Sequence, residues 1–258
     1  MSTLPLGEAG VAILGGTAGV GLEAAAQFAE AGCRLVLFGR NPERGEAAAA
    51  TCRARVPGAS VTFVRVDATD EEAVVKAEAE ARGVLGGIDV LVNTTGPSRP
   101  PALLHTIPGS DAMARIHELV APVVHMTMAV LPDMRARRCG VIVTVASDAA
   151  KVATPGESLI GAAMAGIVMF SKTAALEAKR DGIRINLITP SLIANTPGAG
   201  LLDGDPFSAR LFAKAADQAH LGVAEPEDIA AAILFLAGPG SRRITGQTIS
   251  VNGGISVG

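Results

Sequence analysis

Short runs of apolar residues alternate along this chain with longer stretches in which apolar and polar positions recur at helical spacing. Each short run is bounded by turn-forming residues, which is typical of strands in repeated βαβ units. The pattern predicts seven strands, at Val11–Leu14, Arg34–Phe38, Val61–Arg65, Val90–Val92, Val141–Val145, Arg184–Leu187 and Gln247–Val251. The longer stretches predict six helices, at Leu22–Glu30, Pro42–Arg55, Glu71–Leu85, Asp111–Met134, Leu159–Arg180 and Pro226–Ala237.

This alternation indicates an α/β fold in which helices cover both faces of a parallel sheet. A chain of 258 residues with 49% hydrophobic content can bury one large core, so we expect a single domain over residues 1–258. Ligands of such sheets bind beyond the carboxyl ends of the strands. Residues 190–220 follow the sixth strand, are rich in Gly and Pro, and are expected to form a substrate loop or lid rather than a linker.

Charge and cysteine content argue against several classes of function. The net charge is −3 and the chain has no basic run, so we do not expect nucleic acid as a partner. No stretch approaches about 18 consecutive apolar residues, and the start does not resemble a leader, so a cytoplasmic protein without a membrane segment is expected. The cysteines have no ligand spacing and predict neither a disulfide framework nor a metal site: Cys33, Cys52 and Cys139.

A glycine-rich turn follows the first predicted strand. The sequence GGTAGVG over residues 15–21 spaces its glycines as GxxxGxG immediately before a helix. Such a turn lets the backbone approach a pyrophosphate closely, and the N-terminus of the helix favours the anion. We therefore expect a dinucleotide to bind here, the alternative being a purely structural turn; the binding residues would be Gly15, Thr17, Gly19, Val20 and Gly21.

The end of the second strand bears on which dinucleotide binds. An acidic residue there would bind the ribose 2′-hydroxyl, whereas this chain reads VLFGRNPER. Gly39 leaves space and Arg40 supplies a guanidinium that matches a phosphate, so NADP(H) is favoured over NAD(H) unless Arg40 is only a solvated turn residue. Asp67, which follows the third strand, either accepts a hydrogen bond from the adenine amino group or caps the next helix. Spacing alone leaves both roles open.

Several longer motifs are spread over the chain: GGTAGVG, VDATD, IDVLVNTTG, AVLPDM, GVIVTVAS, DGIRINLITPSLIANT and EPEDIAAAILFLAGPGSRRITGQTISVNGG. Together they resemble the short-chain dehydrogenase/reductase family over nearly the whole length. The resemblance implies a Rossmann-type, doubly wound, parallel seven-stranded sheet, a nicotinamide cofactor, hydride transfer to or from a carbonyl or alcohol, and usually a tetramer. It also places Asn93, Gly96 and Pro190 at the cofactor, with Thr196, which either bonds the nicotinamide carboxamide or caps a helix.

The catalytic positions of that family are only partly kept. Family members use an Asn, a Ser, a Tyr and a Lys, and Ser147 fills the serine position, where its hydroxyl would polarise a substrate oxygen. Ile160 and Met164 stand at the Tyr and Lys positions, and Leu119 stands at the Asn position. The whole chain contains no tyrosine. The family's usual Tyr/Lys mechanism is therefore excluded, and Ile160 and Met164 share one helical face as an apolar wall.

Reduction of a carbonyl needs a proton as well as a hydride, so another group would have to supply it. Lys151, in the loop after Ser147, is the first candidate because a desolvated lysine can act as an acid; the alternative is a solvated loop lysine. Weaker candidates are Asp148, Glu157, Ser158 and His105.

Three functions stay open from the sequence. The first is an NADP(H)-dependent oxidoreductase with altered chemistry, acting on a small-molecule substrate of apolar or mixed character. The second is a catalytically inactive, nucleotide-binding homologue that serves as a structural or regulatory subunit. The third is a non-redox lyase or isomerase. The apolar fourth and fifth helices predict a homo-oligomer, a dimer or a tetramer.

Overall fold

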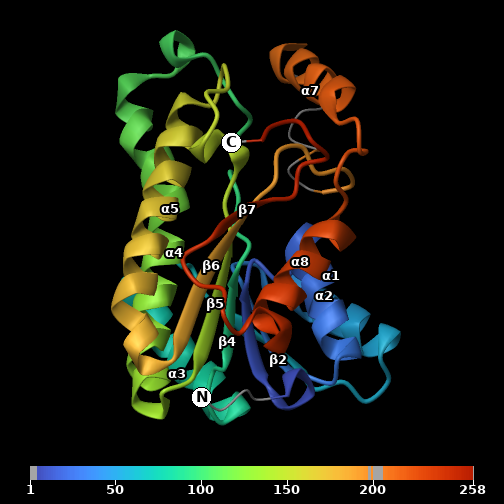
Figure 1. The fold of residues 1–258 in the computed structure, drawn as a ribbon, viewed down its shortest axis with the longest axis vertical. Helices are drawn as coiled ribbons and strands as arrows, with labels where there is room; N and C mark the ends of the chain where they lie inside the picture. The colour runs from blue at the N-terminus through green and yellow to red at the C-terminus, as the bar shows by residue number, and fades with distance from the viewer. Residues whose placement is uncertain (1–4, 197–198, 200–205, 258) are drawn as a thin grey trace.

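The computed structural model describes residues 5–196, 199 and 206–257 of the chain. Its centre is a seven-stranded parallel sheet in the order β3-β2-β1-β4-β5-β6-β7 (Figure 1). The strands are β1 (Gly10–Leu14), β2 (Arg34–Gly39), β3 (Val61–Arg65), β4 (Val90–Asn93), β5 (Gly140–Val145), β6 (Ile183–Thr189) and β7 (Thr248–Ser250). The predicted Rossmann-type sheet is confirmed.

The direction in which strands are added reverses at β1, which pairs with both β2 and β4. Leu14, the last residue of β1, is in register with Phe38 of β2 and Asn93 of β4. The chain therefore runs outward from β1 to β3 and returns on the other side of β1 as β4. A crevice opens beyond the carboxyl ends of the strands at such a reversal, and this is where the fold places a ligand.

Helices cover both faces of the sheet (Figure 1). The helices on one face are α1 (Gly19–Glu30), α2 (Pro42–Arg55) and α8 (Pro226–Ala237). Those on the other face are α3 (Glu71–Leu85), α4 (Gly109–Arg137) and α5 (Ser158–Ala178). Within the described part of the chain, one segment, Ser158–Asp181, is long and apolar enough to cross a membrane, and its helix α5 packs on α4 and β6 as part of this layer.

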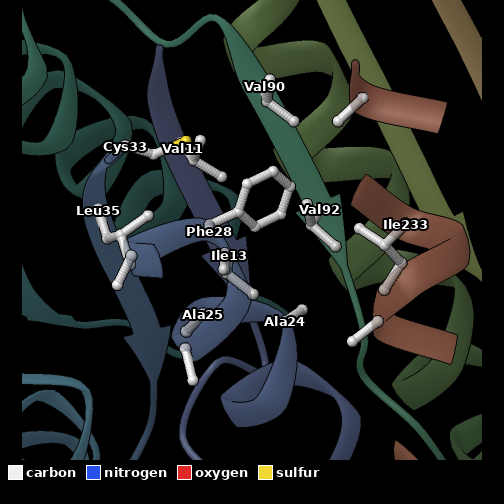
Figure 2. Close-up of a cluster of buried hydrophobic side chains, with 14 of the residues drawn as sticks. Val11, Ile13, Ala24, Ala25, Phe28, Cys33, Leu35, Val90, Val92 and Ile233 are labelled. Atoms are coloured by element: carbon white, nitrogen blue, oxygen red, sulfur yellow. The ribbon is translucent and has the colours of Figure 1, made fainter. Parts of the chain in front are cut away.

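The core between α1 and the sheet is built around Phe28 (Figure 2). Its ring is fully buried, and the cluster around it includes Val11 and Ile13 of β1, Val92 of β4 and Ile233 of α8. Burying side chains of this size contributes about 1.5–3 kcal/mol each. This packing fixes α1 against β1, and with it the glycine-rich turn that joins them.

The predicted loop over residues 190–220 contains a helix that the sequence analysis did not expect, α7 (Pro206–Gln218). The Gly and Pro residues before it favour a loop, but Phe207, Leu211 and Ala215 recur at helical spacing. Figure 1 shows α7 beyond the two helical layers, near the end of the molecule that holds the C-terminus. Residues 197–198 and 200–205 of the predicted lid lie outside the described residues.

Candidate functional site

A cavity of about 660 Å³ lies along the carboxyl ends of the central strands. We call it the main cavity. Its lining runs from the β1–α1 turn, past the residues after β2, β3 and β4, to the residues that follow β5 and β6 and to α7. Its size falls within the range of cofactor and substrate sites. The main cavity therefore lies where the reversal at β1 is expected to place a ligand.

The glycine turn forms one end of the main cavity. Gly15 has a φ of +82°, which only glycine adopts freely, and Gly15, Thr17, Gly19 and Val20 line the cavity. Gly21 does not line it, because it packs behind the turn; a Cβ there would lie 2.3 Å from the Gly15 carbonyl oxygen. No side chain caps the start of α1, so its first N–H groups and its dipole face the cavity and are available to an anion.

Two arginines stand beside this turn at the end of β2. Arg40 and Arg44 both line the main cavity. Arg44 lies in the first turn of α2, which Asn41 caps by accepting a 2.9 Å hydrogen bond from the Arg44 N–H. Arg65 donates from Nε to the Arg40 carbonyl oxygen at 3.2 Å, which adds a third guanidinium to the group. Sequence reasoning missed Arg44, although its place four residues after Arg40 across a helix start was a usable signal.

Asp67 lies at the same end and lines the main cavity. Its Oδ1 accepts hydrogen bonds from the Thr69 backbone N–H at 3.1 Å and the Thr69 hydroxyl at 2.8 Å. These bonds, with smaller contributions from Arg40 and Arg65, hold the pKa of Asp67 below its ordinary value. The cap of α3 is Asp70, which accepts from the Ala73 N–H at 3.2 Å. The alternative role of Asp67 as that cap is therefore wrong.

At the end of β4, Asn93 is buried behind the main cavity, whereas Gly96 lines it. Asn93 is fully buried, donates to the Thr144 hydroxyl at 3.1 Å, and is not among the described residues that line the main cavity. Gly96 does line it, and a Cβ there would meet no atom within 4 Å. Asn93 thus ties β4 to β5, while Gly96 leaves space that a ligand can fill.

The residues after β6 close the far side. Pro190 and Thr196 both line the main cavity. The Thr196 hydroxyl accepts from the Ala199 N–H at 3.2 Å and donates to the Ile193 carbonyl oxygen at 3.2 Å. An acceptor bond to the N–H three residues ahead is the kind of bond that a helix N-cap makes, and Thr196 also lines the main cavity.

Ser147 marks the other end of the main cavity, two residues after β5. Its Oγ accepts from the Ala149 N–H at 3.2 Å, which leaves the hydroxyl hydrogen free to be donated into the cavity. Asp148 beside it is buried, and its Oδ2 accepts from Asn252 Nδ2 and, at 2.8 Å, from the Ser256 hydroxyl.

Lys151 does not occupy the place expected of a proton donor. Its Nζ donates to the Ser250 hydroxyl and lies 3.7 Å from Asp148 Oδ1. Lys151 is not among the described residues that line the main cavity. Its ammonium group is held between the loop after β5 and the end of β7, an arrangement that argues against the expected catalytic role.

Aliphatic residues lie where the family resemblance places the other catalytic groups. Ile160 and Met164 line the main cavity, whereas Leu119 lines a smaller cavity that shares Ile160 with it. Met164 is 2% exposed and Leu119 is 4% exposed, and both belong to one buried apolar cluster between α4 and α5. None of the four histidines is among the described lining residues, so His105 is not placed at the site.

Glu157 lines the main cavity directly before α5. Its carboxylate caps no N–H of α5, and within the described part of the chain it has no hydrogen-bond or ion-pair partner. Burial, and then the nearby charge of Asp148, raise the pKa of the Glu157 carboxyl to about 7. A carboxyl in this state exists in both protonation forms near neutral pH.

The comparisons with known proteins agree with this geometry. A family profile described as enoyl-(acyl carrier protein) reductase matches residues 15–256. The 3-oxoacyl-(acyl-carrier-protein) reductase of Chlamydia trachomatis serovar D is 33% identical over 95% of this chain and 96% of its own. The cis-4-hydroxycyclohexanecarboxylate dehydrogenase of Sinomonas cyclohexanicum is 33% identical over 94% of each chain.

A solved structure gives the same picture. Levodione reductase matches with a TM-score of 0.90 and 25% sequence identity, covering 96% of this chain and 97% of its own. Each of these proteins carries the name of a reductase or a dehydrogenase, and the similarity extends over nearly the whole chain in every case.

Proposed function

The chain belongs to the short-chain dehydrogenase/reductase family, and from this we propose that it is an NADP(H)-dependent oxidoreductase whose reacting end departs from the family pattern. The observation that carries the proposal is one continuous cavity, which joins the glycine turn and Arg40 at one end to Ser147 at the other. The relatives' names describe oxidation and reduction, which agrees with this class of reaction.

The described residues fit a nicotinamide dinucleotide. The uncapped start of α1 and the turn at Gly15 would hold the pyrophosphate, and the open space above Gly96 would take the part of the cofactor that crosses β4. Asp67 would accept from the adenine amino group, and Thr196 and Pro190 would border the nicotinamide. When bound, the nicotinamide supplies or accepts the hydride.

Arg40 and Arg44 support a preference for NADP(H). Both guanidinium groups line the cavity beside the glycine turn, where the family resemblance puts the adenosine ribose, and a 2′-phosphate there would be bonded by charge-assisted hydrogen bonds. Asp67, which carries negative charge nearby, is already engaged by Thr69.

The reacting end favours an apolar or mixed substrate. Ser147 would donate a hydrogen bond to the substrate oxygen, while Ile160, Met164, Leu192 and Phe212 offer apolar contact around it. These side chains exclude water, which strengthens the hydrogen bond from Ser147. We expect the protein to act in the cytoplasm as a homo-oligomer.

Isothermal titration calorimetry with NADPH and NADH tests the cofactor site. Wild type should bind NADPH more tightly than NADH, and Arg40→Ala should weaken NADPH binding by about 10- to 100-fold while leaving NADH binding nearly unchanged. Gly19→Asp should abolish binding of both nucleotides, and the control is Arg242→Ala, at an exposed arginine that is not among the described residues that line the cavity. Equal affinity for the two nucleotides would refute the NADP(H) preference, and binding of neither would refute the oxidoreductase function.

One observation favours a second candidate, a nucleotide-binding subunit without turnover. Leu119 and Met164 are packed into a buried apolar cluster, so two positions that handle protons in relatives have become core. Such a protein would bind NADPH but would reduce no carbonyl compound at any substrate concentration. Steady-state assays beside the calorimetry distinguish the two candidates.

A further inference from the structure

The part of the main cavity near Ser147 has few groups that can exchange a proton. Among the described residues, the titratable side chains that line the whole cavity are Arg40, Arg44, Asp67, Arg99, Glu118, Asp148, Glu157 and Lys214. The first three stand at the glycine-turn end. Asp148 is already bonded to Asn252 and Ser256, Arg99 is paired with Asp111, and Lys214 is exposed on α7. Glu118 and Glu157 are left.

Glu157 has the better position of the two. It is the N-cap residue of α5 and precedes Ile160 by three residues and Met164 by seven, and all three line the main cavity. Glu118 lies on α4 beside Leu119 and also lines the smaller cavity, which contains Arg99 and Arg115. The carboxyl of Glu157 thus stands one helical turn before the position at which relatives carry their tyrosine.

The backbone around Glu157 is held on both sides. The Gly156 carbonyl oxygen accepts from the Ala102 N–H at 2.9 Å, and the Glu157 carbonyl oxygen accepts from the Gly161 N–H at 2.6 Å. Gly156 has a φ of +84°, and a Cβ there would lie 2.5 Å from the Phe207 ring of α7. Because α7 packs this closely on the residue before Glu157, the backbone that carries the Glu157 carboxyl is held in place at the cavity wall.

We propose that the Glu157 carboxyl is the general acid and base of this site, in place of the missing tyrosine. The inference rests on the proposed oxidoreductase function. In the reductive direction, hydride from a reduced nicotinamide dinucleotide forms a new C–H bond as the carbonyl π bond breaks. The oxygen, hydrogen-bonded to Ser147, takes the proton of the Glu157 carboxyl and becomes an alcohol. The carboxylate that is left is reprotonated from water, and oxidation of the alcohol runs the same steps backwards.

The charges around Glu157 suit this role. Asp148 adds a negative charge on the side of β5, and burial removes water, so the protonated form persists near neutral pH, where an acid is useful. From the other elements, Glu118 faces the cavity from α4, Arg99 from the loop after β4 and Lys214 from α7, while Lys151 is directed to Asp148. Glu157 itself forms no ion pair within the described part of the chain, so its proton is free to transfer.

The test compares Glu157→Gln and Glu157→Asp with wild type and with Glu177→Gln, an exposed residue near the other end of α5. NADPH binding is measured by calorimetry, and reduction is measured with cyclohexanone, acetophenone and an oxoacyl thioester. We expect Glu157→Gln to bind NADPH as wild type does but to lose about 100-fold or more in kcat, and Glu157→Asp to recover part of the rate. The rate of wild type should fall above about pH 7, and this limb should be absent from Glu157→Gln.

Infrared difference spectroscopy supplies a readout that needs no turnover. A carboxyl band that titrates near pH 7 should be present in wild type and Glu177→Gln and absent from Glu157→Gln. Unchanged kcat and pH profile in Glu157→Gln, with NADPH bound, would overturn the assignment and leave the oxidoreductase function standing. Wild type that binds no NADPH, or reduces none of the probes, would overturn the proposed function and this inference with it.

Discussion

Glu157→Gln should change the stability of the protein in a pH-dependent way, whatever the protein catalyses. Burial and the charge of Asp148 raise the pKa of Glu157 from 4.5 to about 7 in the folded chain. Between these two values the folded state keeps a proton that the unfolded state has lost. The free energy of unfolding of wild type therefore falls as pH rises through this window and is constant above it.

The size of the effect follows from that pKa difference of about 2.5, which corresponds to about 3 kcal/mol at most once titration is complete. Glutamine cannot titrate, so the free energy of unfolding of the variant does not show this fall with rising pH. From about pH 5.5 to about pH 8.5, Glu157→Gln should gain about 2 kcal/mol of unfolding free energy relative to wild type.

Equilibrium urea unfolding at both pH values measures this gain, with circular dichroism as the probe and Glu177→Gln as the control. The control should show no pH-dependent difference from wild type, because Glu177 is exposed on the same helix. A difference between Glu157→Gln and wild type that is the same at both pH values would show that the folded chain does not hold Glu157 protonated, and would refute the reasoning.

Four further predictions concern packing, charge and assembly. Gly21→Val should lower Tm and abolish NADPH binding, because a Cβ there would lie 2.3 Å from the Gly15 carbonyl oxygen; retained binding by calorimetry would contradict the role of this close approach. Phe28→Ala should cost about 3–5 kcal/mol in urea unfolding, since the ring is fully buried, and a loss below about 1 kcal/mol would be inconsistent with that packing. Asp148→Asn should move the alkaline limb of the rate profile to lower pH, because it removes a like charge beside Glu157; an unmoved limb would argue against that coupling. Light scattering after size exclusion should give a dimer or tetramer, and Met169→Glu, at a side chain that is 64% exposed on α5, should shift it toward monomer; a wild-type monomer would refute the oligomer.

The fold was predictable because local signals and tertiary structure agree. Strands that are buried on both faces consist of short apolar runs, and six of the helices have apolar residues at helical spacing. The sequence therefore predicted the sheet and both helical layers. The helix α7 escaped because its apolar residues, including Leu211, face the main cavity instead of a core and follow a segment rich in Gly and Pro.

The sequence predicted the part of the site whose residues are close together in the chain, which is the glycine turn and the end of β2. The turn at Gly15 and the neighbouring Arg40 lie next to each other in the sequence, and the structure keeps them together at the main cavity. The hydrogen bond from Lys151 to Ser250 could not be predicted, since the two residues are 99 positions apart and no local pattern connects them. The significance of Glu157 rests on burial and on Asp148, both of which exist only in the folded chain.

The bonds from Asn252 and Ser256 to Asp148 bring the last described segment of the chain into the wall of the main cavity, which Ile255 and Ser256 also line. Substitutions at Asn252 or Ser256 should therefore disturb the surroundings of Asp148 in the cavity wall, although both residues follow Asp148 by more than 100 positions in the sequence. For protein engineering, the segment Asn252–Ser256 therefore counts as part of the cavity wall, and changes to it should be assayed as changes to the site.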